Sequence, residues 1–349
     1  MEDKYKIINE SLNKYCKKID DTFYMYNLDF FFNITLEVLS ILERYDTVYS
    51  SETTRIFYIL NPEFDQNKIF LSGIDSVEIV KNYLKEKMPQ YLKEFNDCLS
   101  NGTFRFVDKK EAPEERSYAD LNDDNHPVIN VALNHDYSDP STIIHEFFHH
   151  LNRGVENEII ISRNLLTEGV SIFYETDLYN YMIKLGYDEE EIYKIRRFRI
   201  NDCYEAGRLL LPEITLIDSY IKFGDISERS FEDRQKYTSF GWVNKEDVMY
   251  SINKLLKDNQ EYKFKYDKNI GYIFGTLLAY YGINSKDKTM LEKFIKLNHS
   301  LGNKDVFECL NIIDIDLVDR QTDYELYNSF IKEVKKINKK HKVNVLTKK

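Results

Sequence analysis

The chain has few of the residues that interrupt regular structure or separate domains. Its 349 residues include only 6 prolines and 12 glycines, and no segment is rich in proline, glycine or serine. No segment repeats at a fixed period, which excludes a solenoid or propeller built from repeated units. We therefore expect one continuous structural unit rather than domains joined by a flexible linker.

Cysteine is also scarce. The four cysteines are Cys16, Cys98, Cys203 and Cys309, and none belongs to a Cys-x-x-Cys pair. This spacing indicates neither a disulfide framework nor a thiolate metal cluster. A cytoplasmic location is the simplest expectation.

Long apolar runs are missing as well. The longest apolar clusters, such as residues 28–34, are interrupted and fall far short of the roughly 20 residues that a membrane span needs. Residues 1–21 are mixed and polar, without the pattern of a signal peptide. We therefore expect no membrane partner.

Charge is distributed unevenly along the chain. The formal net charge is -11, yet residues 332–349 contain eight lysines and one glutamate, which leaves 40 basic and 58 acidic residues elsewhere. The net negative charge of residues 1–331 disfavours nucleic acid as a partner, because anionic nucleic acids bind to basic protein surfaces. The basic tail, residues 331–349, is expected to be a solvated end, with an anchor for anionic lipid or RNA as the alternative.

Periodicity predicts a mostly helical protein. Apolar residues at helical spacing predict helices over 29–45, 77–99 and 324–340. Short runs rich in Val, Ile and Phe predict strands over 103–107 and 128–133. The expected fold class is therefore α+β, predominantly helical with a small sheet.

The segment after the second strand contains strong helix signals. Ser138-Asp139-Pro140 offers an N-cap aspartate followed by a proline at the first helical position. We predict a helix over 141–153 that stops near Gly154, and a second helix over 158–185 that ends at Gly186.

The first of these helices has the sequence His145-Glu146-Phe147-Phe148-His149. Two histidines four residues apart share one helix face and can bind one zinc ion, and Glu146 is placed to act on a metal-bound water. After eighteen intervening residues, Glu168 can supply a third ligand from the next helix. Three protein ligands leave one position open, as in catalytic zinc sites; structural sites are closed by four.

The residues around the motif predict a buried helix. Apolar side chains occupy nearly every direction that the two histidines and Glu146 leave, namely Ile143, Ile144, Phe147, Phe148 and Leu151. Burial of an imidazole without a polar partner costs free energy, and a zinc ion bound to His145 and His149 would offset that cost. The alternative is a pair of core histidines hydrogen-bonded to backbone carbonyls.

Two further segments carry a resemblance to a known family. The segment from Thr167 to Glu175, Thr-Glu-Gly-Val-Ser-Ile-Phe-Tyr-Glu, resembles the Asn-Glu-Gly-Phe-Ala-x-x-x-Glu segment of gluzincin metallopeptidases, in particular the aminopeptidase N and leukotriene A4 hydrolase group. Tyr272-Ile273-Phe274-Gly275 resembles the Tyr-x-x-Gly segment that contributes their catalytic tyrosine.

The resemblance implies a zincin-like catalytic domain of thermolysin-like architecture, which we place over 101–330 with a helical region over 1–100 packed on it. It also implies one zinc ion per chain, held by His145, His149 and Glu168. Tyr272 would stabilise the oxyanion. The strand over 128–133 would be a sheet edge to which an extended peptide adds.

The chain departs from the aminopeptidases in one informative place. Their Gly-x-Met-Glu-Asn segment carries the glutamate that binds the free amine of the substrate, whereas residues 126–134 contain no acid. An endopeptidase is therefore favoured over an aminopeptidase. The predicted function is a zinc-dependent peptide hydrolase that acts on a peptide or protein and uses Glu146 as general base.

Several alternatives remain open at this point. One is a zinc-binding interaction module of the same fold without peptidase activity, and another is that the motif is a coincidence in a helical protein. The remaining alternatives concern single residues. Glu156 or Glu158 is the alternative third ligand. Glu175 is either a partner of a ligand histidine or only part of a helix salt bridge, and His150 is either a hydrogen-bonded or partly exposed histidine or a ligand. Tyr266, Tyr280 or Tyr281 is the alternative to Tyr272.

Overall fold

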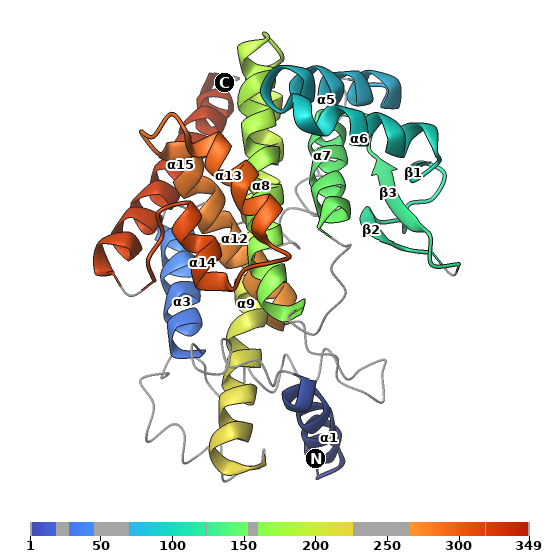
Figure 1. Ribbon diagram of the computed structural model, residues 1–349. Helices are drawn as coiled ribbons and strands as arrows, with labels where there is room; N and C mark the ends of the chain where they lie inside the picture. Colours follow the sequence, from blue (N-terminus) through green and yellow to red (C-terminus); the bar gives the residue numbers. More distant parts are fainter. Residues whose placement is uncertain are drawn as a thin grey trace.

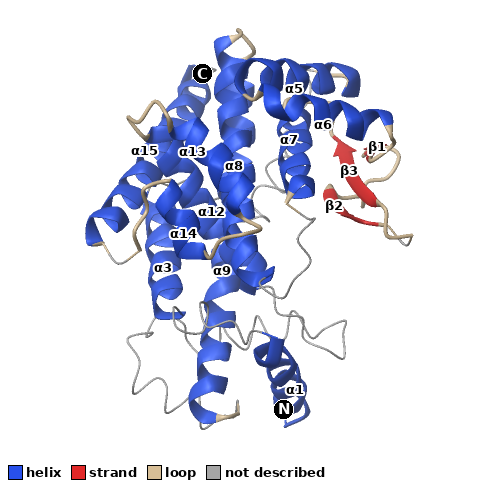
Figure 2. Ribbon diagram, in the orientation of Figure 1, coloured by secondary structure: helices blue, strands red, loops and turns tan. Residues whose placement is uncertain are grey.

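Helices dominate the protein, and a small sheet lies at one side of them (Figure 2). The computed structural model describes residues 2–18, 28–44, 70–122, 124–152, 160–225, 266–317 and 319–347. The helices of these residues are α1 (Glu2–Lys18), α3 (Leu28–Arg44), α5 (Gly73–Lys87), α6 (Pro89–Ser100), α7 (Ser138–Leu151), α8 (Ile160–Lys184), α9 (Glu189–Phe223), α12 (Tyr266–Asn284), α13 (Met290–Ser300), α14 (Val306–Ile312) and α15 (Arg320–Thr347). The predominantly helical fold with a small sheet is as the sequence predicts.

Within the described residues, the sheet has three strands in the order β1-β3-β2. Strand β1 (Phe104–Asp108) runs parallel to β3 (Pro127–Leu133), and β2 (Tyr118–Leu121) runs antiparallel to it. The sequence predicts β1 and β3 within one residue at each end. It misses β2, which has only four residues and a single buried side chain, Ala119.

The central place of β3 corrects one expectation. All five residues of β1 pair with β3 over residues 129–133, while β2 pairs with it over residues 127–130. An extended peptide therefore cannot add along β3 as the resemblance implies, since most of its backbone groups are already paired. The sheet edges are β1 and β2.

Helix α7 lies between the sheet and the long helices, as Figure 1 shows. On one side it contacts β3 and β2, and on the other it packs against α8. Contact on both sides explains why this helix is apolar around so much of its circumference. It confirms that the motif helix is buried.

The long helices form the body of the molecule. Helix α8 lies beside α12, and α9 packs against α12, α3 and α15 (Figure 1). A fully buried ion pair joins two of them: an Arg196 nitrogen on α9 lies 2.6 Å from a Glu333 oxygen on α15, and each side chain is 2% exposed. Residues far apart in the sequence thus share one core.

Two predicted helix boundaries need correction. The helix predicted over 77–99 is two helices, because Pro89 has no N–H to continue α5 and instead begins α6. Helix α7 begins at Ser138, with Tyr137 as its N-cap, so Asp139 lies in the first turn rather than at the cap. The Asp139 carboxylate accepts hydrogen bonds from the backbone N–H groups of Asn134 and His135, both at 2.8 Å.

Two features agree with the absences noted in the sequence. All four cysteines lie in described helices, and none of them forms a disulfide. Among the residues that the structure covers, no helix is both long and apolar enough to cross a membrane. The division of the chain at residues 100 and 330 stays a prediction.

Candidate metal centre

The two motif histidines face each other on α7. His145 Nε2 lies 3.0 Å from His149 Nε2, and the two rings meet edge to face with their centroids 4.6 Å apart. The side chain of His145 is 6% exposed and that of His149 is 21% exposed. Four residues of α-helix bring both side chains to the same face, so this pairing follows from local geometry alone.

Helix α8 brings Glu168 to the same point. One carboxylate oxygen of Glu168 lies 3.6 Å from His145 Nε2, and the other lies 3.6 Å from His149 Nε2. Phe148 stacks on Tyr174 of α8 with a centroid separation of 3.9 Å, which fixes the two helices against each other. The three predicted ligand residues therefore converge on one small volume.

The chemistry of this group fits a divalent cation. Two ring nitrogens that face each other repel unless a proton or a cation lies between them, and the buried Oε2 of Glu168 has no hydrogen-bond partner among the described residues. Ligands of one tetrahedral zinc, at about 2.0–2.2 Å from the ion, are about 3.4 Å apart. The observed separations of 3.0 and 3.6 Å lie close to that value.

The protonation state of Glu168 also suits the binding of a cation. Burial by itself would raise the pKa of this carboxyl, but the adjacent imidazoles of His149 and His145, with the more distant Arg199, outweigh burial and bring the pKa to about 2. The carboxylate is therefore ionised at neutral pH. An ionised oxygen ligand is what a hard or borderline cation requires.

A further carboxylate, that of Glu175, contacts the His145 ring on the side away from His149. Glu175 Oε2 lies 3.3 Å from His145 Nδ1, the ring nitrogen that does not face His149. Glu175 follows Glu168 by seven residues, or two helical turns, so both carboxylates are on one face of α8. This is a charge contact rather than a well-aligned hydrogen bond, because Nδ1 has no hydrogen-bond partner among the described residues. A carboxylate on this side of the ring would favour Nε2 as the atom that binds a cation.

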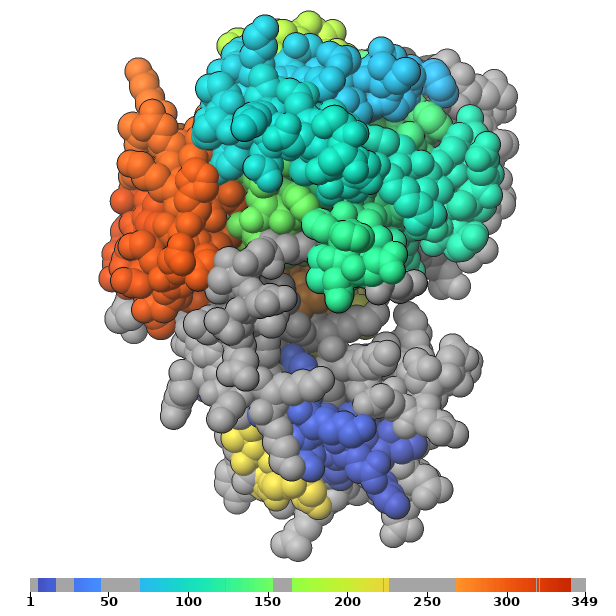
Figure 3. Space-filling view, turned by 45° about the vertical axis from the view of Figure 1, so that its right-hand side comes forward, coloured from blue at the N-terminus to red at the C-terminus, as the bar shows by residue number. Residues whose placement is uncertain are grey.

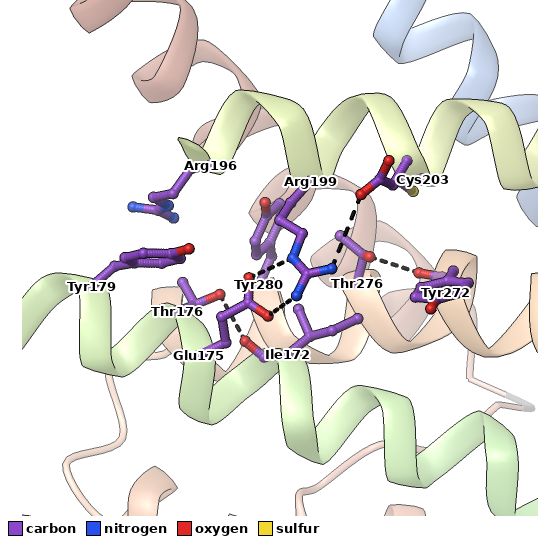
Figure 4. A pocket seen from close by; sticks show the side chains of 11 residues that line it. Ile172, Glu175, Thr176, Tyr179, Arg196, Arg199, Cys203, Tyr272, Thr276 and Tyr280 are labelled. Carbon is purple, nitrogen blue, oxygen red and sulfur yellow. Dashed lines mark hydrogen bonds and ion pairs between the residues drawn. The ribbon is translucent and has the colours of Figure 1, made fainter. Parts of the chain in front are cut away.

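Arg199 of α9 completes this support, and no pattern in the sequence indicates it. Its guanidinium donates two hydrogen bonds of 2.8 Å to the two oxygens of Glu175, as Figure 4 shows. Burial raises the pKa of Glu175, but the charge of Arg199 and the contact with His145 outweigh it, so the pKa is lowered. Glu175 therefore contacts a candidate ligand, and its salt bridge joins α8 to α9 instead of lying within one helix.

Tyr272 on α12 lies near the same carboxylates. The charge of Glu168 is the largest cause that raises the pKa of its phenol, followed by burial, and Glu146 contributes in the same direction. The hydroxyl is therefore protonated at neutral pH and can donate a hydrogen bond. The structure brings Tyr272 towards the predicted ligands, although the chain separates it from Glu168 by about a hundred residues.

A close helix crossing explains this proximity. A Cβ added at Gly275 of α12 would lie 2.7 Å from the backbone nitrogen of Gly169 on α8, closer than real Cβ atoms approach. The two glycines follow Glu168 by one residue and Tyr272 by three. The glycines of both motifs thus let two helix backbones come into contact next to Glu168 and Tyr272.

The other candidate tyrosines are placed differently. Tyr280 is buried beside Arg196 and Glu333, and burial is the main cause that raises its pKa. The charges that act on Tyr281 come chiefly from Glu325 and other residues at a distance from the candidate ligands. The side chain of Tyr266 lies outside the described residues.

Glu146, the predicted general base, follows His145 in the sequence and is buried on α7, with 9% of its surface exposed.

His150 points away from the predicted ligands, and its Nε2 lies 3.6 Å from the sulfur of Cys98. The alternative third ligands, Glu156 and Glu158, lie outside the described residues.

A small cavity of about 20 Å³ lies beside the centre, on the Arg199 side of Glu175. Tyr272, Thr276 and Tyr280 contribute to its walls, as Figure 4 shows. It has room for about one or two water molecules. Its walls do not include the three predicted ligands, so it is a space behind the centre rather than a substrate cleft.

Comparison with known proteins finds a similar fold but no sequence family. No protein-family model matches the chain, and no curated protein sequence matches it. A solved structure from Chlamydophila abortus, of a protein called a "putative peptidase", has a similar fold with a TM-score of 0.53 and 13% sequence identity. The match covers 88% of this chain and 55% of that one, so this chain spans about half of that protein's length. At this identity the likeness shows the fold alone.

Proposed function

We propose that this protein is a zinc-dependent peptide hydrolase of the gluzincin type. The observation that carries the proposal is the convergence of His145, His149 and Glu168 from two helices on one buried point. The supporting contact of Glu175 with His145 and the position of Tyr272 add to it. Three ligands leave one position open for the reacting water.

In this proposal the ion, when bound, acidifies a water molecule and polarises the scissile carbonyl. Glu146 takes the proton from that water and later delivers it to the leaving amine. The hydroxyl of Tyr272 donates a hydrogen bond to the carbonyl oxygen as negative charge develops on it. Glu175 holds the ring of His145, and Arg199 holds Glu175.

Three observations support the finer assignment. The order of the strand, motif helix and following helix is the one expected of a zincin-like, thermolysin-like catalytic unit, and a similarly folded protein is called a "putative peptidase". An endopeptidase is favoured because residues 126–134, which include β3, carry no acid to bind a free amine. We infer that the substrate is a peptide or protein chain.

Replacement of the general base tests the proposal. Glu146→Gln should keep the zinc ion held by His145, His149 and Glu168, because Glu146 is not a ligand, and should abolish cleavage of a peptide library. The matched control is Glu78→Gln, which changes an exposed glutamate on α5 and should leave cleavage unchanged. Full activity of Glu146→Gln would refute its role as base. Bound zinc with no cleavage by the wild-type chain would identify a binding module instead.

A further inference from the structure

A second group of metal-ligating side chains lies between α6 and α7. Glu94 and Cys98 of α6 and His150 of α7 each offer a ligand atom, and these atoms all lie within 4.8 Å of one another. The sulfur of Cys98 lies 3.6 Å from His150 Nε2. None of the three belongs to the first centre, so the group has no part in the proposed hydrolysis.

The helices hold this group in place through their shared core. Glu94 and Cys98 are four residues apart and therefore lie on one face of α6. The neighbouring buried positions of that face make two edge-to-face ring contacts with α7: Phe95 with Phe147 at 5.1 Å, and Tyr91 with Phe148 at 5.2 Å. The approach of Cys98 to His150 is thus set by core packing and not by loose surface side chains.

The separation of sulfur and nitrogen agrees with a shared ion. Bond lengths of about 2.3 Å to sulfur and about 2.05 Å to nitrogen place the two ligand atoms of a tetrahedral zinc about 3.6 Å apart. Cys98 and His150 show this distance already. Glu94 is exposed, and its side chain can rotate to bring a carboxylate oxygen to the same ion.

We propose that Glu94, Cys98 and His150 form a second metal site, selective for a thiophilic divalent cation such as Zn²⁺, Cd²⁺ or Co²⁺. The site is mixed, with one sulfur, one nitrogen and one oxygen, whereas the first centre has no sulfur. Its fourth position faces solvent on the Glu94 side, since α5 and α6 lie at the outside of the molecule (Figure 3).

An ion at this site would join α6 to the last turn of α7. His150 is the neighbour of His149 in the sequence, and the two side chains point about 100° apart around the helix. The ion would therefore hold the end of α7 that carries the ligand His149. Before it binds, burial and the charges of Glu94 and Asp97 raise the pKa of the Cys98 thiol to about 11, so binding releases a proton.

Cobalt titration of the full-length, metal-free chain tests the proposal. Thiolate bound to Co²⁺ gives a charge-transfer absorption in the near ultraviolet, and the first centre cannot produce it because it lacks sulfur. The wild-type chain should show this band, saturating at one cobalt per chain beyond the first. Cys98→Ser should lose it while retaining the cobalt of the first centre. Failure of the peptidase proposal would not affect this readout.

Two outcomes would overturn the proposal. One is a folded wild-type chain, checked by circular dichroism, that binds cobalt without the band. The other is an equal band in Cys98→Ser, which would assign it to another cysteine. If Cys98→Ser does not fold, His150→Gln is the second variant, since it keeps the thiol. The cobalt affinity, measured from the growth of the band, should fall by at least about tenfold, because the loss of even a residue that only supports a ligand has an effect of that size. An unchanged affinity would also overturn it.

Discussion

At the scale of single residues, Glu175 shows how one carboxylate serves two neighbours. It faces His145 Nδ1 at 3.3 Å and accepts two hydrogen bonds from Arg199, while only 2% of its side chain is exposed. A buried carboxylate is costly unless paired, and these contacts provide the pairing. The sequence indicates that Glu175 and Glu168 share a helix face, but not that an arginine from another helix meets them.

Glu175→Gln should weaken zinc binding by about 10- to 100-fold, because the uncharged amide holds the His145 ring less firmly and pairs less strongly with Arg199, which keeps only Asp202 as a charged partner. Competition with a coloured chelator measures the affinity. Glu78→Gln on the surface is the control and should bind zinc as the wild type does. An unchanged affinity in correctly folded Glu175→Gln would reduce its role to a helix salt bridge.

Tyr272→Phe should slow hydrolysis by an amount equivalent to about 2 to 4 kcal/mol of transition-state stabilisation, since the phenol is the proposed donor to the oxyanion. Zinc content should not change. Tyr281→Phe, on the same helix but away from the candidate ligands, is the control in steady-state assays with one peptide. A loss of less than about threefold would transfer the role to another tyrosine.

At the scale of elements, the crossing of α8 and α12 decides the geometry of the candidate centre. Gly169 and Gly275 permit backbone contact, and that contact brings Tyr272 towards Glu168. In the sequence these glycines are only parts of two separate motifs. In the structure both glycines lie at the contact between α8 and α12, the two helices that lie side by side in Figure 1.

Gly275→Ala should therefore destabilise the fold by about 1 to 3 kcal/mol and lower activity, because its Cβ would collide with backbone that cannot yield without moving a helix. Urea unfolding measures the free energy. Gly207→Ala is the matched control: its Cβ would approach only side-chain atoms, the nearest a terminal methyl carbon of Leu39 at 2.9 Å, and no backbone of another helix. Equal stability of Gly275→Ala and the wild type would show that α8 and α12 can move apart at this crossing without loss of stability.

At the scale of the whole molecule, a bound ion would link α7 to α8 and so join the part of the protein that contains the sheet to the long helices. A ligand that binds only the folded state stabilises it by mass action. At a free zinc concentration about a thousand times the dissociation constant, the gain is about 4 kcal/mol.

Removal of zinc by a chelator should consequently abolish hydrolysis and lower the midpoint of thermal unfolding, and added zinc should restore both. Differential scanning calorimetry follows the midpoint. In Glu168→Ala, which lacks one ligand, the shift produced by the same zinc concentration should be much smaller. A shift of equal size in that variant would place the stabilising ion elsewhere.

Local spacing in the sequence determined a substantial part of this protein. The helix period puts His145 and His149 on one face, and the apolar residues around them predict a buried helix, as found. The helical class and the strands β1 and β3 also follow from short patterns. These features depend on residues within a few positions of one another, so the sequence alone contains the necessary signal.

Tertiary structure alone decided which distant residues meet. It placed Arg199 on Glu175, Cys98 beside His150 and Gly275 against Gly169, and it made β3 the central strand rather than an edge. Each of these contacts joins elements whose docking depends on the fit of many side chains at once. No short pattern encodes that fit, because its stability is shared across the whole core.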